Sequence, residues 1–202
     1  GTLSFELSIN KEKIITNCGS INKRTGKNPE YLRYSAAHST IILNNTNISE
    51  LINKKSYTRT PTNITFDQDK HEKFTIWQSS HNGYLNNYKK IIKRKLKIYF
   101  EKNLIEGEDS FLSTKITSKK MIYHIRFHLM PDCNCILTNS KKNVLIKTKF
   151  NQSLIFKSDS PLSIEDSIYV EGQKQIKHTK QIVITGHTED KKKIEKWSIN
   201  QI

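Results

Sequence analysis

Residues 121–129 read Met-Ile-Tyr-His-Ile-Arg-Phe-His-Leu, and this stretch indicates most clearly what kind of fold the chain adopts. Apolar and polar residues alternate along it, and successive side chains of a β-strand point to opposite faces of a sheet. The stretch therefore predicts a half-buried strand rather than a helix. The odd-numbered side chains form its apolar face, and the opposite face carries His124, Arg126 and His128.

Similar short segments, separated by turn residues, recur on both sides of this strand. They predict strands at residues 3–9, 13–17, 38–43, 74–78, 92–100, 144–150, 153–157, 167–171, 181–185 and 196–199. Residues 53–72 read as a loop, 81–84 as a turn and 106–109 as an acidic turn, and only residues 89–100 leave room for a helix. The pattern favours an all-β fold, a large antiparallel β-sandwich of the supersandwich-like kind with few or no helices.

The chain of 202 residues is long enough for one large β-domain, and no repeat or shift in composition divides it. We therefore expect one domain over residues 1–202. No apolar run approaches the roughly 18 residues that a membrane-spanning helix needs, so no membrane span is predicted. Cys18, Cys133 and Cys135 are odd in number and lack the spacing of a zinc knuckle, so we interpret them as ordinary thiols.

The net charge of +15 suggests a polyanionic partner. Acidic glycans, nucleic acids and anionic membranes are all attracted to such a surface. The abundance of Lys, Asn and Ile also fits a coding bias alone. Arginine, whose planar fork suits specific phosphate or sulfate recognition, is scarce.

Residues 77–84, Trp-Gln-Ser-Ser-His-Asn-Gly-Tyr, place aromatic side chains on either side of His81. A pyranose ring can pack its face on an aromatic ring, so Trp77, His81 and Tyr84 are candidate sugar contacts. The alternative is a turn whose aromatic residues fill the edge of the sandwich.

The polar face of residues 121–129 is a second candidate site. Two imidazoles that flank a guanidinium could bind a carboxylate or a sulfate, although a solvated outer face fits the same pattern. A third candidate is His38, which lies in the stretch Ala-Ala-His-Ser-Thr at residues 36–40. Its alternative role is that of a histidine at the edge of the core, bonded to backbone.

An ordered set of these motifs resembles the C-terminal β-domain of heparinase II/III-like polysaccharide lyases. The set consists of TLSFEL (2–7), CGS (18–20), AAHST (36–40), SSHNGY (79–84), IIKRKL (91–96), GED (107–109) and YHIRFHL (123–129). The resemblance extends over nearly the whole chain and is densest over residues 2–129. No single motif decides it.

The resemblance implies a parent lyase that cleaves acidic, uronate-containing glycans by β-elimination. Members of the family join an N-terminal (α/α) toroid, which carries most of the catalytic base and acid, to a C-terminal β-sandwich. A His-Ala-His-Ala-Asp-type segment precedes the strand that matches Thr2–Ser8, and this chain begins after it. We therefore expect this chain alone to be inactive, to partner the toroid and to form one wall of a glycan cleft, with candidate contacts His81, Tyr84, His124, Arg126 and His128.

The resemblance also implies a zinc ion. His38 matches one zinc ligand of the family, and Asn17 stands where the family has an aspartate. A neutral amide is a much poorer zinc ligand than a carboxylate. Zinc is accordingly expected at most in the full-length parent and not in this chain. The family likeness further suggests a bacterial cell envelope or periplasmic setting.

Two other functions remain open at this point. One is a non-catalytic β-module that binds carbohydrate or other polyanions. The other is a basic nucleic-acid-binding β-protein, which would interleave aromatic and basic residues on one exposed sheet face. The aromatic residues here alternate mostly onto the apolar face, so nucleic acid is the less favoured partner. Heparin-like, alginate-like and bacterial envelope glycans all remain as substrates.

Overall fold

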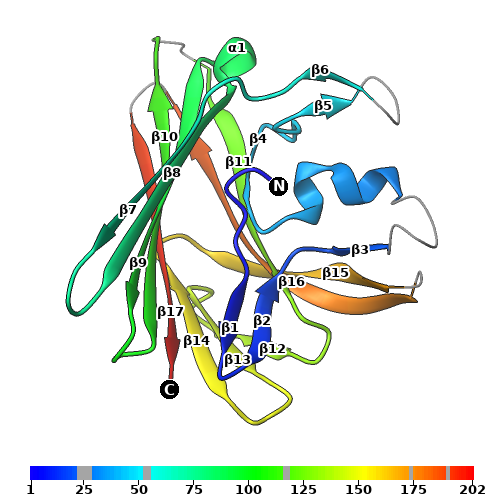
Figure 1. The fold of residues 1–202 in the computed structure, drawn as a ribbon, viewed down its shortest axis with the longest axis vertical. Coiled ribbons are helices and arrows are strands. Elements are labelled where there is room, and N and C mark those ends of the chain that lie inside the picture. The colour runs from blue at the N-terminus through cyan, green and yellow to red at the C-terminus, as the bar shows by residue number, and fades with distance from the viewer. Residues whose placement is uncertain (22–28, 52–55, 116–118, 173–174, 190–191) are drawn as a thin grey trace.

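The structure is a computed structural model that describes residues 1–21, 29–51, 56–115, 119–172, 175–189 and 192–202. Within these ranges the chain consists mainly of β-strands in two large sheets (Figure 1), and the predicted all-β sandwich is confirmed. The pairs are antiparallel except for β3 with β15. A small third sheet pairs β5 (Glu50–Leu51) with β6 (Tyr57–Arg59).

One large sheet has seven strands. In spatial order they are β1 (Leu7–Ile9), β2 (Glu12–Thr16), β11 (Met121–Leu129), β16 (Gln175–Thr188), β15 (Leu162–Gly172) and β3 (Gly19–Ile21), with β4 (Ile41–Leu43) paired to β11. The other large sheet has eight strands. In spatial order they are β12 (Asn134–Leu137), β13 (Asn143–Lys147), β14 (Ser153–Ser158), β17 (Lys193–Gln201), β10 (Leu104–Ser113), β9 (Lys90–Tyr99), β8 (Thr75–Tyr84) and β7 (Ile64–Lys70).

Helical structure in the described ranges is confined to three short elements. These are η1 (Glu30–Arg33), η2 (Ser35–Ala37) and α1 (Leu85–Tyr88). None of them has the length or the apolar character to cross a membrane. Of the three, η2 matters most for the site described below, because it lies against the outer face of the seven-stranded sheet.

The core lies between the inner faces of the two sheets. The Phe127 ring of β11 lies 4.7 Å from that of Phe156 and 4.8 Å from that of Trp197, measured between centroids. Phe111 and Tyr123 stack across the same interior at 4.4 Å. Burying each such side chain stabilises the fold by about 1.5–3 kcal/mol. The apolar face predicted for residues 121–129 is therefore the face that holds the two sheets together.

The structure corrects the loop predicted at residues 53–72, of which 53–55 lie outside the described residues. β6 and β7 both fall within it, and β7 pairs with β8 over seven residues. Every β7 residue is exposed, so no buried face produces the apolar alternation by which strands are identified. Cross-strand bonds hold β7 in place, including a contact of 2.7 Å between the hydroxyls of Thr65 and Ser80. Residues 81–84, predicted as a turn, are the end of β8.

The acidic turn predicted at residues 106–109 is also wrong, because these residues lie within β10. Asp109 points into the core, where its carboxylate binds Arg94 at 2.7 and 2.8 Å and accepts a bond from Trp197 Nε1 at 3.0 Å. A Cβ at Gly107 would lie only 2.1 Å from the Trp197 indole. Asp109 is accommodated inside the strand because it forms a buried ion pair with Arg94. Gly107 is required there because the Trp197 ring leaves no room for a side chain.

Three smaller differences concern strand ends. Leu3 has a φ of 57°, which interrupts the extended backbone, so the first strand begins at Leu7 rather than near residue 3. Residues 89–100 contain the strand β9 and no helix. The strand predicted at residues 38–43 is limited to Ile41–Leu43, because η2 ends just before it.

Candidate functional site

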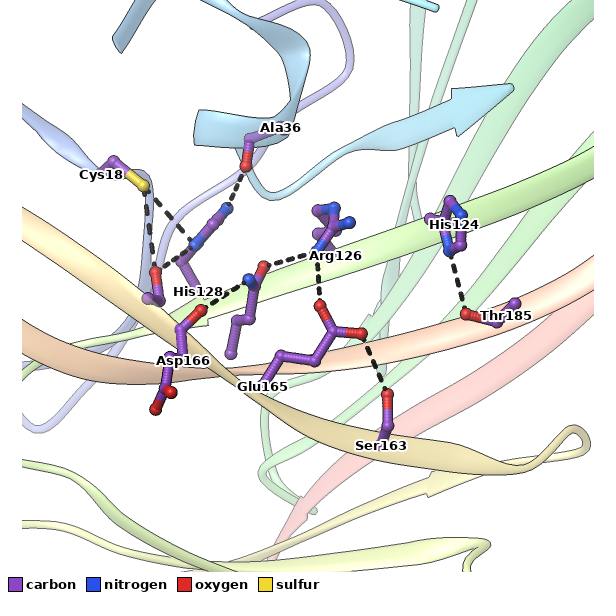
Figure 2. A network of polar contacts seen from close by, with 11 residues as sticks. Cys18, Ala36, His124, Arg126, His128, Ser163, Glu165, Asp166 and Thr185 are labelled. Atoms are coloured by element: carbon purple, nitrogen blue, oxygen red, sulfur yellow. Dashed lines mark hydrogen bonds and ion pairs between the residues drawn. The ribbon is translucent and has the colours of Figure 1, made fainter. Parts of the chain in front are cut away.

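His124, Arg126 and His128 lie on the outer face of the seven-stranded sheet (Figure 2), as the alternation along β11 predicts. We call these three residues the polar row. On the neighbouring strand β16 they face Thr185, Val183 and Gln181 respectively. On β15, next to β16, Glu165 faces Gln181. Three strands therefore bring polar side chains together that are far apart in the sequence.

The His128 end of the polar row is closed. This side chain is 2% exposed, with Nδ1 2.7 Å from Ser167 Oγ and Nε2 2.9 Å from the carbonyl oxygen of Ala36 in η2. A carbonyl can only accept, so Nε2 carries the proton and Nδ1 accepts from the Ser167 hydroxyl. Burial lowers the pKa of His128 to about 4, which keeps the ring neutral at pH 7. Both ring nitrogens are therefore occupied within the protein.

Arg126, in the middle of the row, is only partly satisfied. One terminal nitrogen donates to Glu165 Oε2 at 2.9 Å and to Gln181 Oε1 at 3.2 Å. The guanidinium Nε is buried and has no hydrogen-bond partner among the described residues, so a ligand does not reach it in this arrangement. The Arg126 side chain is 17% exposed and the Glu165 side chain 41% exposed, so the ion pair contributes at most about 1 kcal/mol to stability. The guanidinium is held in a fixed orientation, and its second terminal nitrogen, which makes no hydrogen bond within the described residues, can donate to an acceptor.

The His124 end of the row is open. His124 is half-buried, and its Nδ1 lies 2.9 Å from Thr185 Oγ1. Partial burial lowers its pKa, and the nearby Arg126 charge lowers it further, so the imidazole is neutral at pH 7. This half of the row thus offers a neutral imidazole, a guanidinium and a carboxylate. Such a set can form hydrogen bonds with hydroxyl and carboxylate groups of a ligand.

His81 and Tyr84 lie in the interior, which corrects the surface position expected for them. His81 Nδ1 accepts a bond from the Gly83 backbone N–H at 3.0 Å, and burial lowers its pKa to about 4. The Tyr84 hydroxyl donates to the Thr46 carbonyl at 2.8 Å, and burial raises the pKa of this fully buried group. Neither side chain offers a surface for a sugar ring, because both fill the edge of the sandwich.

His38 and Asn17 lie close together but do not form a metal centre. The carbonyl oxygen of the Asn17 side chain accepts a bond from the Ser39 backbone N–H at 3.0 Å. Nδ1 of His38 lies 3.2 Å from the amino group of Gly1, and burial lowers the pKa of His38 to about 4. No three His, Cys, Asp or Glu side chains gather into a metal site within the described ranges. These residues therefore do not fit zinc by themselves, and zinc in the full-length parent stays a prediction.

The sequence interpretation missed the residues that complete the row. Ser163, Glu165 and Ser167 alternate with apolar or exposed residues on β15, which is a strand signal. The strand predicted there begins only at residue 167. Nothing in the sequence places β15 two strands away from β11, because that neighbour relation depends on the pairing of both strands with β16.

The sequence matches the family model described as "Heparinase II/III-like, C-terminal" over residues 1–198. A comparison with curated proteins gave no match. Among solved structures, the heparan sulfate lyase HepC from Pedobacter heparinus has a TM-score of 0.76 and 13% sequence identity, over 98% of this chain and 30% of that chain. The structure of heparinase III, the BT4657 gene product, has a TM-score of 0.77 and 10% identity, over 98% of this chain and 30% of that chain.

At these identities the likeness to the two solved structures shows a shared fold and nothing finer. The chain spans about 30% of the length of either structure. The family model, in contrast, covers nearly the whole sequence, including every motif that carries the resemblance. The chain therefore belongs to the heparinase II/III-like, C-terminal family.

Proposed function

We propose that this chain is the C-terminal domain of a polysaccharide lyase that cleaves acidic, uronate-containing glycans by β-elimination, and that its polar row forms part of one wall of the glycan cleft. The observation that carries the proposal is the open half of the row. There one terminal nitrogen of the Arg126 guanidinium makes no hydrogen bond within the described residues, on the same face as the half-exposed His124. The net charge of +15 would attract an acidic polymer toward this surface.

The chemistry of β-elimination gives the polar row a defined task. A base removes the proton α to the uronate carboxyl group, the C4–O bond breaks, and negative charge builds up on the carboxyl oxygens. A preorganised guanidinium next to those oxygens stabilises the charge as it forms. Arg126 has the required donors, and Glu165 and Gln181 hold it in orientation. The catalytic base and acid would come from an N-terminal toroid of the same protein, its proposed partner.

Two expectations from the family resemblance belong to the same proposal. One is a zinc ion in the full-length parent, for which this chain would supply His38. The other is a bacterial cell envelope or periplasmic setting.

The proposal is tested by incubating the full-length protein with a panel of acidic polysaccharides and following the absorbance of the unsaturated uronate product. We expect product with at least one uronate-containing polymer. Arg126→Gln is expected to lower kcat/KM by about tenfold to a hundredfold, because the variant loses a charged donor. Lys149→Gln removes one charge at an exposed position away from the row and should leave kcat/KM unchanged.

Two results would contradict the proposal. One is that no uronate polymer yields product. The other is that Arg126→Gln and Lys149→Gln behave alike, which would show that the row acts only through its charge. Gel-shift titration with nucleic acid over a range of salt tests the less favoured alternative, since binding to phosphates falls steeply with salt.

A further inference from the structure

A groove of about 740 Å³ lies between the N-terminal segment, residues 1–6, and the edge of the eight-stranded sheet. Figure 1 shows β7 and β8 at that edge, with the N-terminal segment nearer the middle of the molecule. The groove opens on the inner face of β7 and β8, whereas the polar row lies on the outer face of the other sheet. We call it the aromatic groove. It is separate from the site described above.

Two aromatic side chains form one wall of the aromatic groove. Phe66 faces Ser79 and Gln68 faces Trp77 in the register of β7 with β8, so Phe66 and Trp77 are diagonal neighbours on one face. Phe66 is 66% exposed and Trp77 40% exposed. Exposed aromatic residues that gather on one face mark a binding surface more often than scattered ones do. The antiparallel ladder on which they stand fixes their spacing.

The two tryptophans of the chain differ in a way that sets Trp77 apart. Trp197 is 3% exposed, and its Nε1 donates to Asp109. Trp77 Nε1 makes no hydrogen bond within the described residues, and the partly exposed Trp77 side chain lines the groove. An indole with a free N–H combines an apolar surface with a polar edge. Trp77 is therefore available to a ligand, whereas Trp197 is committed to the core.

The opposite wall of the groove combines polar and apolar side chains. It is formed by residues 1–6, which lie outside any β-ladder and include Thr2, Ser4 and Glu6 together with Leu3 and Phe5. The Glu6 carboxylate accepts bonds from Lys13 at 2.8 Å and from Asn17 at 3.3 Å, so its charge is largely offset by Lys13. A ligand that fits this groove needs one apolar face and one edge rich in hydroxyl groups. A pyranose ring has both.

We propose that the aromatic groove binds a pyranose unit of a glycan chain, which stacks on Trp77 and Phe66 and turns its hydroxyl groups toward residues 1–6. The groove is within the usual volume range of small-ligand sites, and its combination of aromatic surface with a few polar groups is typical of them. The inference takes its choice of glycan from the proposed function. It needs no catalytic activity, because stacking on this wall involves no residue of the polar row.

The test is hydroxyl-radical footprinting of the full-length protein, with and without a heparan sulfate hexasaccharide. Mass spectrometry reports the oxidation of each aromatic residue separately. Without the sugar, Trp77 and Phe66 should oxidise readily, and with it both should be protected. Phe150 is an exposed aromatic residue outside the groove and should oxidise equally in both samples, whereas Trp197 should stay protected in both.

A matched binding measurement by calorimetry completes the test. Trp77→Ala should weaken binding of the hexasaccharide by about tenfold, the loss of one aromatic contact, and Trp77→Phe should retain most of it. Phe150→Ala should have no effect. An uncharged cellohexaose arm measures how much of the binding needs charge.

Two outcomes would overturn the inference. One is sugar binding that leaves Trp77 oxidation and the Trp77→Ala affinity unchanged. The other is a Trp77 that is already protected without sugar, which would show that a protein domain covers the groove. An inactive parent that still protects Trp77 would contradict the proposed lyase function and leave the groove supported, so the two proposals fail separately.

Discussion

The two histidines of the polar row lie four residues apart on the same face of one strand, yet their surroundings are opposite. His128 is enclosed by Ser167 of β15 and by the Ala36 carbonyl of η2, and both of its ring nitrogens are bonded. His124 has one contact, to Thr185, and is half-exposed. Alternation along β11 determines the face that each residue occupies. What covers that face depends on η2, a short element far away in the sequence. The same residue type is thus structural at one end of the row and available to a ligand at the other.

The largest effect is expected at the closed end. His128→Ala should lower the free energy of unfolding by about 2–4 kcal/mol, because it leaves a cavity and removes the partner of the Ser167 hydroxyl and the Ala36 carbonyl. Urea titration at pH 7 measures the change. If the free energy of unfolding falls only as much as in an ordinary surface substitution, the closed end contributes no more to stability than the open end.

Acid should destabilise the fold through His128, at the same closed end of the row. His128 has a folded-state pKa of about 4, and an unfolded histidine titrates near 6.5. Between these two pKa values the imidazole binds a proton in the unfolded chain but not in the folded chain. The free energy of unfolding therefore stays level above pH 7 and falls as the pH drops from about 6.5 toward 4, by about 1.4 kcal/mol per pH unit for each such histidine.

Urea titrations at pH 7, 6 and 5 check this slope. His128→Gln should show a shallower fall than the unsubstituted protein, although His81 and His38, whose pKa values are also lowered by burial, keep their own shares. His124→Gln should leave the slope nearly unchanged, because His124 is half-exposed. An identical pH slope for the unsubstituted protein and His128→Gln would mean that His128 binds its proton as readily in the folded chain as in the unfolded one.

In the middle of the row, Glu165→Gln should free Arg126 from its counter-charge. We expect the variant to bind a heparan sulfate hexasaccharide severalfold more tightly at low salt, with little change in stability, because the pair is partly exposed. Glu171→Gln is the matched control, since it removes the same charge from an exposed pair with Lys177. Calorimetry at two salt concentrations compares them. Equal gains in affinity would mean that Arg126 has no special part in binding.

The smallest effect on stability is expected at the open end. His124→Ala removes one bond to Thr185 and should change the free energy of unfolding by no more than about 0.5 kcal/mol. Its effect on hexasaccharide affinity should be below about tenfold, the size of one neutral hydrogen bond. Urea titration and calorimetry on the same sample separate the two. A large loss of stability would place His124 in the same structural role as His128.

The aromatic residues show how far the sequence could be interpreted. The stretch at residues 77–84 suggested a stacking surface, but β8 continues to Tyr84 and its last residues fill the interior. Trp77 is the one aromatic residue of that stretch that stays exposed, and its neighbour on the sheet is Phe66 from a segment predicted as loop. β7 has no buried face, so its sequence lacks the sustained alternation of apolar and polar residues by which a strand is predicted. Its existence follows from hydrogen bonding to β8, which no local pattern reveals.

By itself the sequence determined the fold class, the inner and outer faces of β11 and the family, because alternation and ordered motifs are local properties of the chain. It did not determine which polar residues are accessible. Accessibility depends on cover from distant segments: η2 over His128, the edge of the sandwich around His81 and Tyr84, and residues 1–6 opposite Trp77. Strand pairing and packing create these neighbours only when the whole chain folds, and with them the difference between a structural histidine and one that can meet a ligand.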